Sequence, residues 1–142
     1  MNTTSAAVAG AATFVWLGMV LAISFLEAPL KFRAPGVTLR LGLGIGRLVF
    51  RALNVAESVL AVVVLVAVAV GDPTGGVVVP TVVVSLLLLG QLAVLRPRLN
   101  RRSDRVLAGE DLPRSNAHFA YVGAEVAKVV ALLWLGVAAL AA

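Results

Sequence analysis

The sequence contains no cysteine and only one histidine among its 142 residues. The missing cysteines exclude disulfides, thiolate metal sites and cysteine nucleophiles, and the single histidine excludes a multi-histidine metal or haem site within one chain. No nucleophile elbow surrounds any serine, and the Glu-x-x-His spacing of carboxylate-bridged metal bundles is also missing. We therefore expect no metal and no cofactor, assign no catalytic residue, and favour a protein that is not an enzyme.

Apolar side chains are abundant. They make up 61% of the residues, only 13% are charged, and the mean hydropathy is +1.02, which is more apolar surface than a soluble domain of this size could bury. Four apolar stretches cover about residues 6–30, 48–70, 77–95 and 118–141, each near the roughly 20 residues that cross a bilayer. Because lipid offers the backbone no hydrogen bonds, these stretches must be helices. The sequence predicts an all-α integral membrane four-helix bundle, with residues 1–142 forming one domain.

Basic residues are concentrated near the ends of these stretches. The net charge is +5, and eleven of the twelve basic residues lie in two segments, 31–51 and 96–114. Beside apolar runs such charge indicates contact with anionic membrane lipids, so we expect lipid and no nucleic acid as a partner. The positive-inside rule places the two basic loops, residues 31–47 and 96–117, in the cytoplasm. Both termini and the turn at residues 71–76 then lie outside, in the cytoplasmic (inner) membrane of a bacterium.

Ionisable side chains within the apolar stretches are the best indication of function, because each charge costs a few kcal/mol in lipid. In the last stretch, the spacing from His118 to Lys128 places four polar side chains on one helical face. We expect a polar pocket that opens to the cytoplasm and is closed by an apolar plug. Three carboxylates, Glu27, Glu57 and Glu125, would meet there and bind a proton or a cation. The candidate binding residues are Glu27, Asn54, Glu57, Gln91, His118, Tyr121, Glu125 and Lys128.

Local pairing is the alternative interpretation of the same charges. Glu125 would pair with Lys128 within one helical turn, and Glu27 would meet Lys31. Glu57 would pair with Arg51 or with Asn54. Each charge would then be neutralised by its own neighbour, and the polar residues would serve packing alone.

A glycine-rich segment forms a second candidate site. Gly42-x-Gly44-x-Gly46 stands just before Arg47 and Arg51, and bare amides at a helix N-terminus attract phosphate. A phospholipid headgroup is the expected anion, although the glycines could also allow the loop to fold tightly against the helices. The candidate anion or headgroup residues are Lys31, Gly44, Gly46, Arg47 and Arg51.

The two halves of the chain share a weak internal repeat. Glu57 aligns with Glu125, each preceded by an alanine pair at the same spacing, and Glu27 aligns near Gln91. Such a repeat would relate the two helical hairpins by an axis along the membrane normal.

The first hairpin resembles the four-helix family typified by transmembrane protein 205. The resemblance lies in Trp16-Leu17-Gly18, in the run from Glu27 through Pro29 to Phe32, and in the run from Gly46 through Phe50 to Asn54. It covers about residues 14–57 and implies a four-helix membrane fold, without a settled reaction or substrate.

Three functions fit these patterns. The first is a small membrane carrier or ion-binding protein for a small solute, a proton or a cation, acting as a homo-oligomer because four helices enclose little space. The second is an accessory or assembly subunit of a larger membrane complex, packed through small residues. The third is a lipid- or quinone-modifying enzyme that would use Arg47, Arg51 and the carboxylates at the headgroup level.

Overall fold

The computed structural model describes residues 1–112 and 116–142, and this part of the chain consists of helices joined by short turns. Four continuous helical stretches are long and apolar enough to cross a membrane: Thr3–Arg33, Leu39–Val70, Gly75–Leu107 and Asn116–Ala141. The first comprises α1 (Thr3–Val20), η1 (Leu21–Glu27), α2 (Ala28–Leu30) and η2 (Lys31–Arg33). The second is α3 (Leu39–Val70), the third comprises α4 (Gly75–Gly90), η3 (Gln91–Leu95) and α5 (Arg96–Leu107), and the fourth is α6 (Asn116–Ala141).

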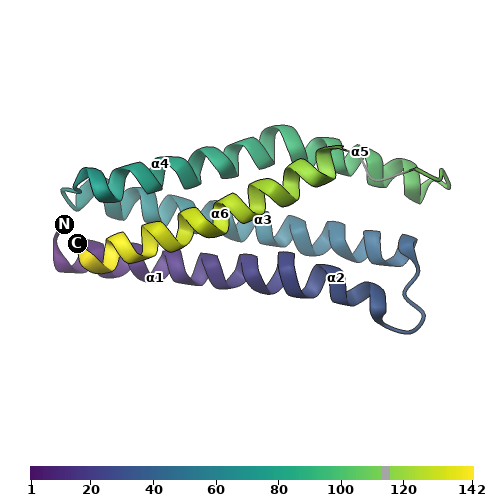
Figure 1. Ribbon diagram of the computed structural model, residues 1–142, viewed down its shortest axis with the longest axis horizontal. Helices are drawn as coiled ribbons and strands as arrows, with labels where there is room; N and C mark the ends of the chain where they lie inside the picture. The colour runs from purple at the N-terminus through teal and green to yellow at the C-terminus, as the bar shows by residue number, and fades with distance from the viewer. Residues whose placement is uncertain (113–115) are drawn as a thin grey trace.

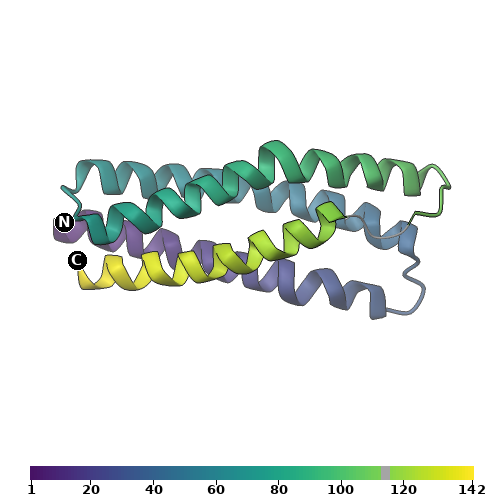
Figure 2. The same cartoon turned by 45° about the horizontal axis from the view of Figure 1, so that its top comes forward.

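The four helices lie side by side as an elongated bundle (Figures 1 and 2). Both termini and the turn at residues 71–74 lie at one end, which we call the terminal end. Residues 34–38 and 108–112 lie at the other, which we call the basic end, and α6 begins short of it. α1 packs against α3 and α6, and α4 packs against α6, so the predicted antiparallel hairpins are confirmed.

The first predicted loop is much shorter than expected. The segment at residues 31–47 contains only residues 34–38 as non-helical chain, because α3 already begins at Leu39. Thr38 starts this helix with an extended backbone, and its side chain accepts a hydrogen bond from the Leu41 amide at 3.1 Å. A Cβ at Gly42 would stand 2.1 Å from the Phe32 ring, so this glycine allows the two helix ends to approach closely.

The glycines therefore do not form the expected cradle of bare amides, whereas headgroup binding by Lys31, Arg47 and Arg51 stays a prediction. Gly44 and Gly46 lie inside α3, where backbone amides are bonded to carbonyls one turn earlier, and no bare amides remain at these positions to bind phosphate. The glycines suggested a loop because glycine is unfavourable in helices. In the structure Gly42 makes room for Phe32, and Gly46 makes room for Lys31, whose Nζ lies 3.0 Å from a Cβ built at Gly46.

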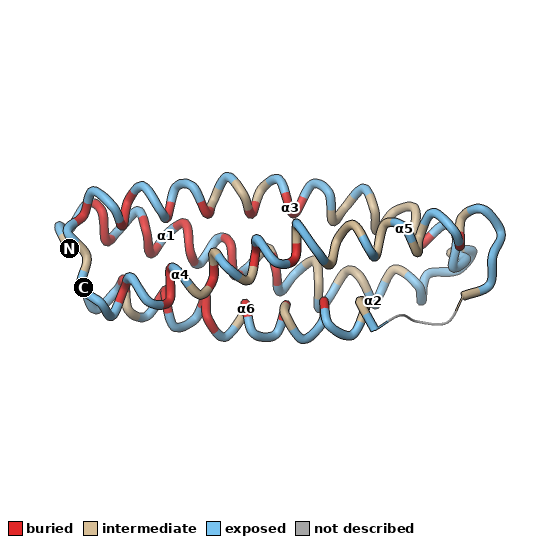
Figure 3. Tube along the Cα trace, turned by 90° about the horizontal axis from the view of Figure 1, so that it is seen from above, coloured by how far each residue is buried: buried red, intermediate tan, exposed pale blue. Residues whose placement is uncertain are grey.

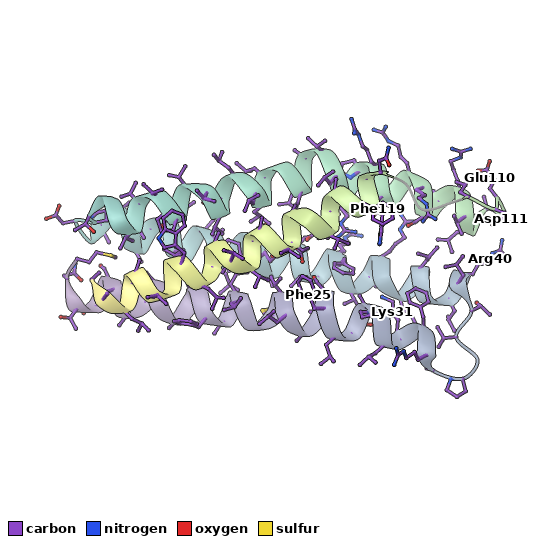
Figure 4. All side chains as sticks on the ribbon, in the orientation of Figure 1. Phe25, Lys31, Arg40, Glu110, Asp111 and Phe119 are labelled. Carbon is purple, nitrogen blue, oxygen red and sulfur yellow. The ribbon has the colours of Figure 1, made fainter. Side chains whose placement is uncertain are left out.

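The third helix also runs past its predicted end at residue 95. α5 continues to Leu107, so within the described residues the second basic loop is limited to residues 108–112. Residues 113–115 lie outside the described part of the chain. At this loop the Arg105 guanidinium hydrogen-bonds the Glu110 carboxylate at 2.9 Å and holds the pKa of Glu110 below its ordinary value. Figure 4 shows Arg40, Glu110 and Asp111 at the extreme basic end, beyond Lys31.

Two π-helical segments allow the long helices to pass a proline. Pro29 follows η1 and Pro97 follows η3, and proline both lacks an amide donor and crowds the carbonyl four residues earlier. The amide of Ala28 bonds the carbonyl of Ile23, and that of Arg96 bonds the carbonyl of Gln91, each five residues back. The wider turn lets both helices continue, which the sequence-based boundaries did not anticipate.

The two hairpins repeat one another in register. The same number of residues separates Thr13 from Thr81, Pro29 from Pro97, and Glu57 from Glu125. Both threonines and both glutamates are buried, and both prolines follow a π-helical segment. Glu27, by contrast, aligns with Leu95 in this register and not with Gln91.

The apolar core fills the half of the bundle nearest the terminal end. One cluster includes Ala9, Val64 and Leu135, and a second, adjoining the polar network described below, includes Trp16 and Leu132. Figure 3 shows the buried stretches along the inward sides of the helices in this half, whereas the basic end is mainly exposed. The predicted apolar plug thus corresponds to two packed side-chain clusters.

Candidate functional site

A buried ion-pair network lies where the four helices meet. The Lys128 side chain on α6 has no exposed surface, and its Nζ lies 2.5 Å from Glu57 Oε1 and 2.6 Å from Glu125 Oε1. The same ammonium donates a hydrogen bond to Gln91 Oε1 at 2.7 Å. Glu57 comes from α3 and Gln91 from η3, so this one cation is held by oxygen atoms from three helical stretches.

Further donors hold the two carboxylates in place. Trp16 Nε1 on α1 donates to Glu57 Oε1 at 2.9 Å, and Ser24 Oγ on η1 donates to Glu125 Oε2 at 2.5 Å. Gln91 Nε2 donates to Glu125 Oε1 at 2.8 Å. Both oxygen atoms of Glu125 therefore accept hydrogen bonds, whereas Glu57 Oε2 is buried without a partner among the described residues.

The two π-helical segments supply partners of the same carboxylate. Ser24 lies within η1 and Gln91 begins η3, and both bond Glu125 from opposite hairpins. A π-helical turn inserts an extra residue and changes the direction in which the following side chains point, and such segments are frequent at functional sites. The local distortion at each proline thus positions a polar side chain toward the network.

Glu27 does not join this network. Its Oε2 lies 3.7 Å from Lys31 Nζ, one turn further along the same helix, as the local-pairing interpretation predicts. Of the three carboxylates expected to converge, two do so, and they converge on Lys128. Glu125 pairs with Lys128 as local pairing also predicts, but Glu57 reaches the same lysine from another helix and does not pair with Arg51.

A cavity of about 400 Å³ connects the basic end with the network. Ser24 and Glu125 form its inner limit, and His118 and Tyr121 of α6 line it nearer the basic end. Figure 4 shows Phe25 further from the basic end than Lys31 along the long axis, with Phe119 on α6 at a level similar to that of Lys31. We call this space the inner cavity; its remaining polar lining residues are Lys31, Arg47, Arg96, Asn100, Arg102 and Ser103.

A second cavity of about 780 Å³ lies along α3, η3 and α5. Asn54, Gly44 and Arg51 line it, together with Arg47 and Arg96, which are shared with the inner cavity. The expected binding residue Asn54 is buried and lines this second space, and its side chain makes no hydrogen bond to the network within the described part of the chain. Apart from Glu27, the candidate binding residues divide between two cavities and one network, where the sequence predicted a single pocket.

Three residues of the network and the cavities were not predicted from the sequence. Trp16 and Ser24 occur in an apolar stretch where one aromatic ring and one hydroxyl are commonplace, so nothing marked them. Arg96 was assigned to a solvated loop, yet it lies on α5 beside both cavities. Its position one residue before Pro97 was the available signal, because proline tolerated in a continuous helix requires a local distortion.

Comparisons with family models, with curated proteins and with solved structures give no match to this chain. The resemblance of the first hairpin to the transmembrane protein 205 family stays a prediction.

Proposed function

We propose that the chain spans the cytoplasmic membrane of a bacterium with its basic end in the cytoplasm, and that it carries a small solute together with a proton. The observation that carries this proposal is the position of Glu125, which belongs both to the buried network and to the lining of the inner cavity. A solute in the cavity would thus meet a charge that all four helices hold in place. The four apolar helices and the arginines at one end support the orientation.

Glu57 is the proton-binding residue in this proposal. With all three groups ionised, the network has two negative charges and one positive charge, and an uncompensated charge is costly within lipid. Glu125 accepts hydrogen bonds on both oxygen atoms, whereas Glu57 Oε2 has no partner among the described residues and is available to a proton. Tyr121 of α6 interacts electrostatically with both Glu57 and Glu125, and the Arg96 guanidinium of α5 lies over the Tyr121 ring.

Lys128 argues for a proton over a metal cation. Its ammonium already occupies the position between Glu57, Glu125 and Gln91 where a cation would bind. A metal ion would have to displace a covalently attached charge from a fully buried position. A proton on Glu57 needs no such displacement and leaves Lys128 paired with Glu125.

The experiment uses proteoliposomes that contain a trapped pH-sensitive dye. Succinate, benzenesulfonate, glycine, lysine and glucose are added outside in turn, since each crosses lipid poorly by itself. We expect at least one of them to acidify the lumen in the presence of the protein, and we expect Glu57→Gln to abolish this acidification. Arg98→Lys, which changes an exposed arginine on α5, is the matched control and should keep it. Acidification by none of the solutes, or equal acidification with Glu57→Gln, would contradict the proposal.

Assembly into a homo-oligomer stays a prediction, and the original reason for expecting it is now weaker. It was expected because four helices enclose little space, yet a single chain encloses a cavity of about 400 Å³. Transport by one chain is therefore sufficient for the proposal.

A further inference from the structure

The wall of the inner cavity carries four basic side chains, and three of them have partners. Lys31 faces Glu27 at 3.7 Å, and Arg47 pairs with Asp104. Arg102 Nη2 donates to the Leu112 carbonyl at 3.1 Å. Glu125 is the one carboxylate in the described lining of this cavity, and it is already saturated by donors. The cavity is thus positively charged on balance.

Arg96 is different from the other three. Its Nε and Nη2 atoms are buried and lack a hydrogen-bond partner among the described residues. The guanidinium carbon lies 4.8 Å from the centroid of the Phe50 ring and 4.4 Å from that of Tyr121. The two rings fix the guanidinium by cation–π contacts while leaving its donors unused. Buried donors without acceptors are unfavourable, so this arrangement calls for an acceptor that the described residues do not provide.

The two unused atoms have a specific geometry. Nε and Nη2 form the side-on edge of a guanidinium, from which two parallel N–H groups can bind both oxygen atoms of one carboxylate, phosphate or sulfonate group. Lysine cannot offer this pair of donors, and neither a neutral sugar nor a cation matches it. The ligand that fits Arg96 is an oxyanion.

We propose that the inner cavity binds a small organic anion, with its oxyanion group on Nε and Nη2 of Arg96 and its apolar body among the aromatic side chains. Phe25, Phe32, Phe50 and Leu99 provide the apolar lining. A volume of about 400 Å³ suits a molecule of the size of a substituted benzene ring or a short acyl chain. Both nitrogen atoms are covered in this structure, so the Tyr121 or Phe50 ring turns aside when the anion binds.

This inference names the class of solute that the proposed carrier would transport, and its consequence for transport rests on the proposed function. An anion beside Glu125 is repelled while the network carries a net negative charge. A proton on Glu57 removes that charge, so proton binding and anion binding favour one another. The protein would then take up the anion with a proton.

The test uses the sole tyrosine of the chain as a reporter. The protein is labelled with 3-fluorotyrosine, so Tyr121 gives the single fluorine resonance, and benzenesulfonate is titrated at constant pH in phosphatidylcholine nanodiscs. We expect a saturable shift of this resonance, and benzenesulfonamide, which has the same body without the charge, should not produce it. Arg96→Lys keeps the positive charge but loses the pair of donors, so the affinity should fall at least tenfold. Arg98→Lys is the control and should bind like the unchanged protein.

A lipid is the other source of an oxyanion on an apolar body. Nanodiscs of phosphatidylglycerol therefore form a second arm, and a fluorine shift that depends on Arg96 and arises only with this lipid would support the site with a headgroup as its ligand. No shift with either probe, or a shift that Arg96→Lys leaves unchanged, would overturn the inference. Binding at Arg96 without acidification of proteoliposomes would leave the site standing and remove the carrier. Acidification by lysine or glucose alone would keep the proton-coupled carrier and remove the anion site.

Discussion

At the scale of single residues, Lys128 determines whether the interior of the bundle can hold two carboxylates. It is fully buried and shared between Glu57 and Glu125. A buried ion pair contributes little compared with an apolar pair of the same shape, but removal of one partner leaves an uncompensated charge. The consequences of substitution should therefore be strongly asymmetric within this network.

Lys128→Met should lower the free energy of unfolding by about 3–5 kcal/mol, because both carboxylates then lose their counter-charge. Glu57→Gln should cost no more than about 1.5 kcal/mol, since the amide oxygen can still accept from Trp16 and Lys128. The measurement is reversible unfolding of the protein in mixed detergent micelles. Equal losses for the two variants would show that the network does not carry the charges assigned to it. The double variant should recover part of the loss of Lys128→Met, because only one carboxylate then remains unpaired.

Most residues of this network could be predicted from the sequence, but the contacts among them could not. A charge within an apolar stretch is costly wherever it lies, so Glu57, Glu125, Gln91 and Lys128 were marked by composition and depth alone. Which carboxylate meets which cation depends on helix rotation, and the π-helical segments alter that rotation. Glu27 was therefore grouped with the other two although its partner is Lys31 on its own helix.

At the scale of the elements, the helix ends show what hydropathy does not reveal. The four stretches were predicted from apolar length, and their existence and order are confirmed. Their ends lie beyond the apolar runs, because capping at Thr38 and the wider turns before Pro29 and Pro97 extend the helices into basic sequence. Hydropathy detects the part that suits lipid, whereas backbone hydrogen bonding decides where a helix stops.

Two threonines offer a matched test of the extended second helix. Thr38 caps α3 through its side chain, whereas Thr74 precedes α4 without a side-chain cap bond. Thr38→Ala should reduce the local stability of the first turn of α3 by about 1 kcal/mol, and Thr74→Ala should have almost no effect on α4. Hydrogen exchange of the amides at residues 41–43 and 77–79 measures both. Rapid exchange at residues 42 and 43 in the unchanged protein would contradict the helix itself, and equal effects of the two substitutions would contradict the cap.

At the scale of the whole molecule, polarity changes steadily from one end to the other. Packed apolar clusters occupy the terminal end, the ion-pair network follows, and the cavities and arginines lie toward the basic end. This order gives an aqueous solute a path from the basic end as far as Glu125, beyond which the two core clusters fill the bundle. Transport in this account requires the apolar half to open in a second conformation.

The orientation can be tested because the chain has no cysteine of its own. Ala108→Cys lies exposed at the basic end and Ala142→Cys lies exposed at the terminal end. A membrane-impermeant maleimide added to intact spheroplasts should label the second and not the first, and inverted vesicles should give the opposite result. Labelling of Ala108→Cys in intact spheroplasts would place the basic end outside and contradict the proposed topology.

The coupling between the buried network and the inner cavity is the central claim, and the affinity of benzenesulfonate for the Glu57→Gln variant tests it most directly. The affinity is measured from the Tyr121 fluorine resonance at one constant pH. Glu57→Gln removes one negative charge from the network, so this variant should bind the anionic probe more tightly than the unchanged protein does. Arg98→Lys, which changes an exposed arginine, should bind like the unchanged protein. Equal or weaker binding of benzenesulfonate by Glu57→Gln would contradict the account.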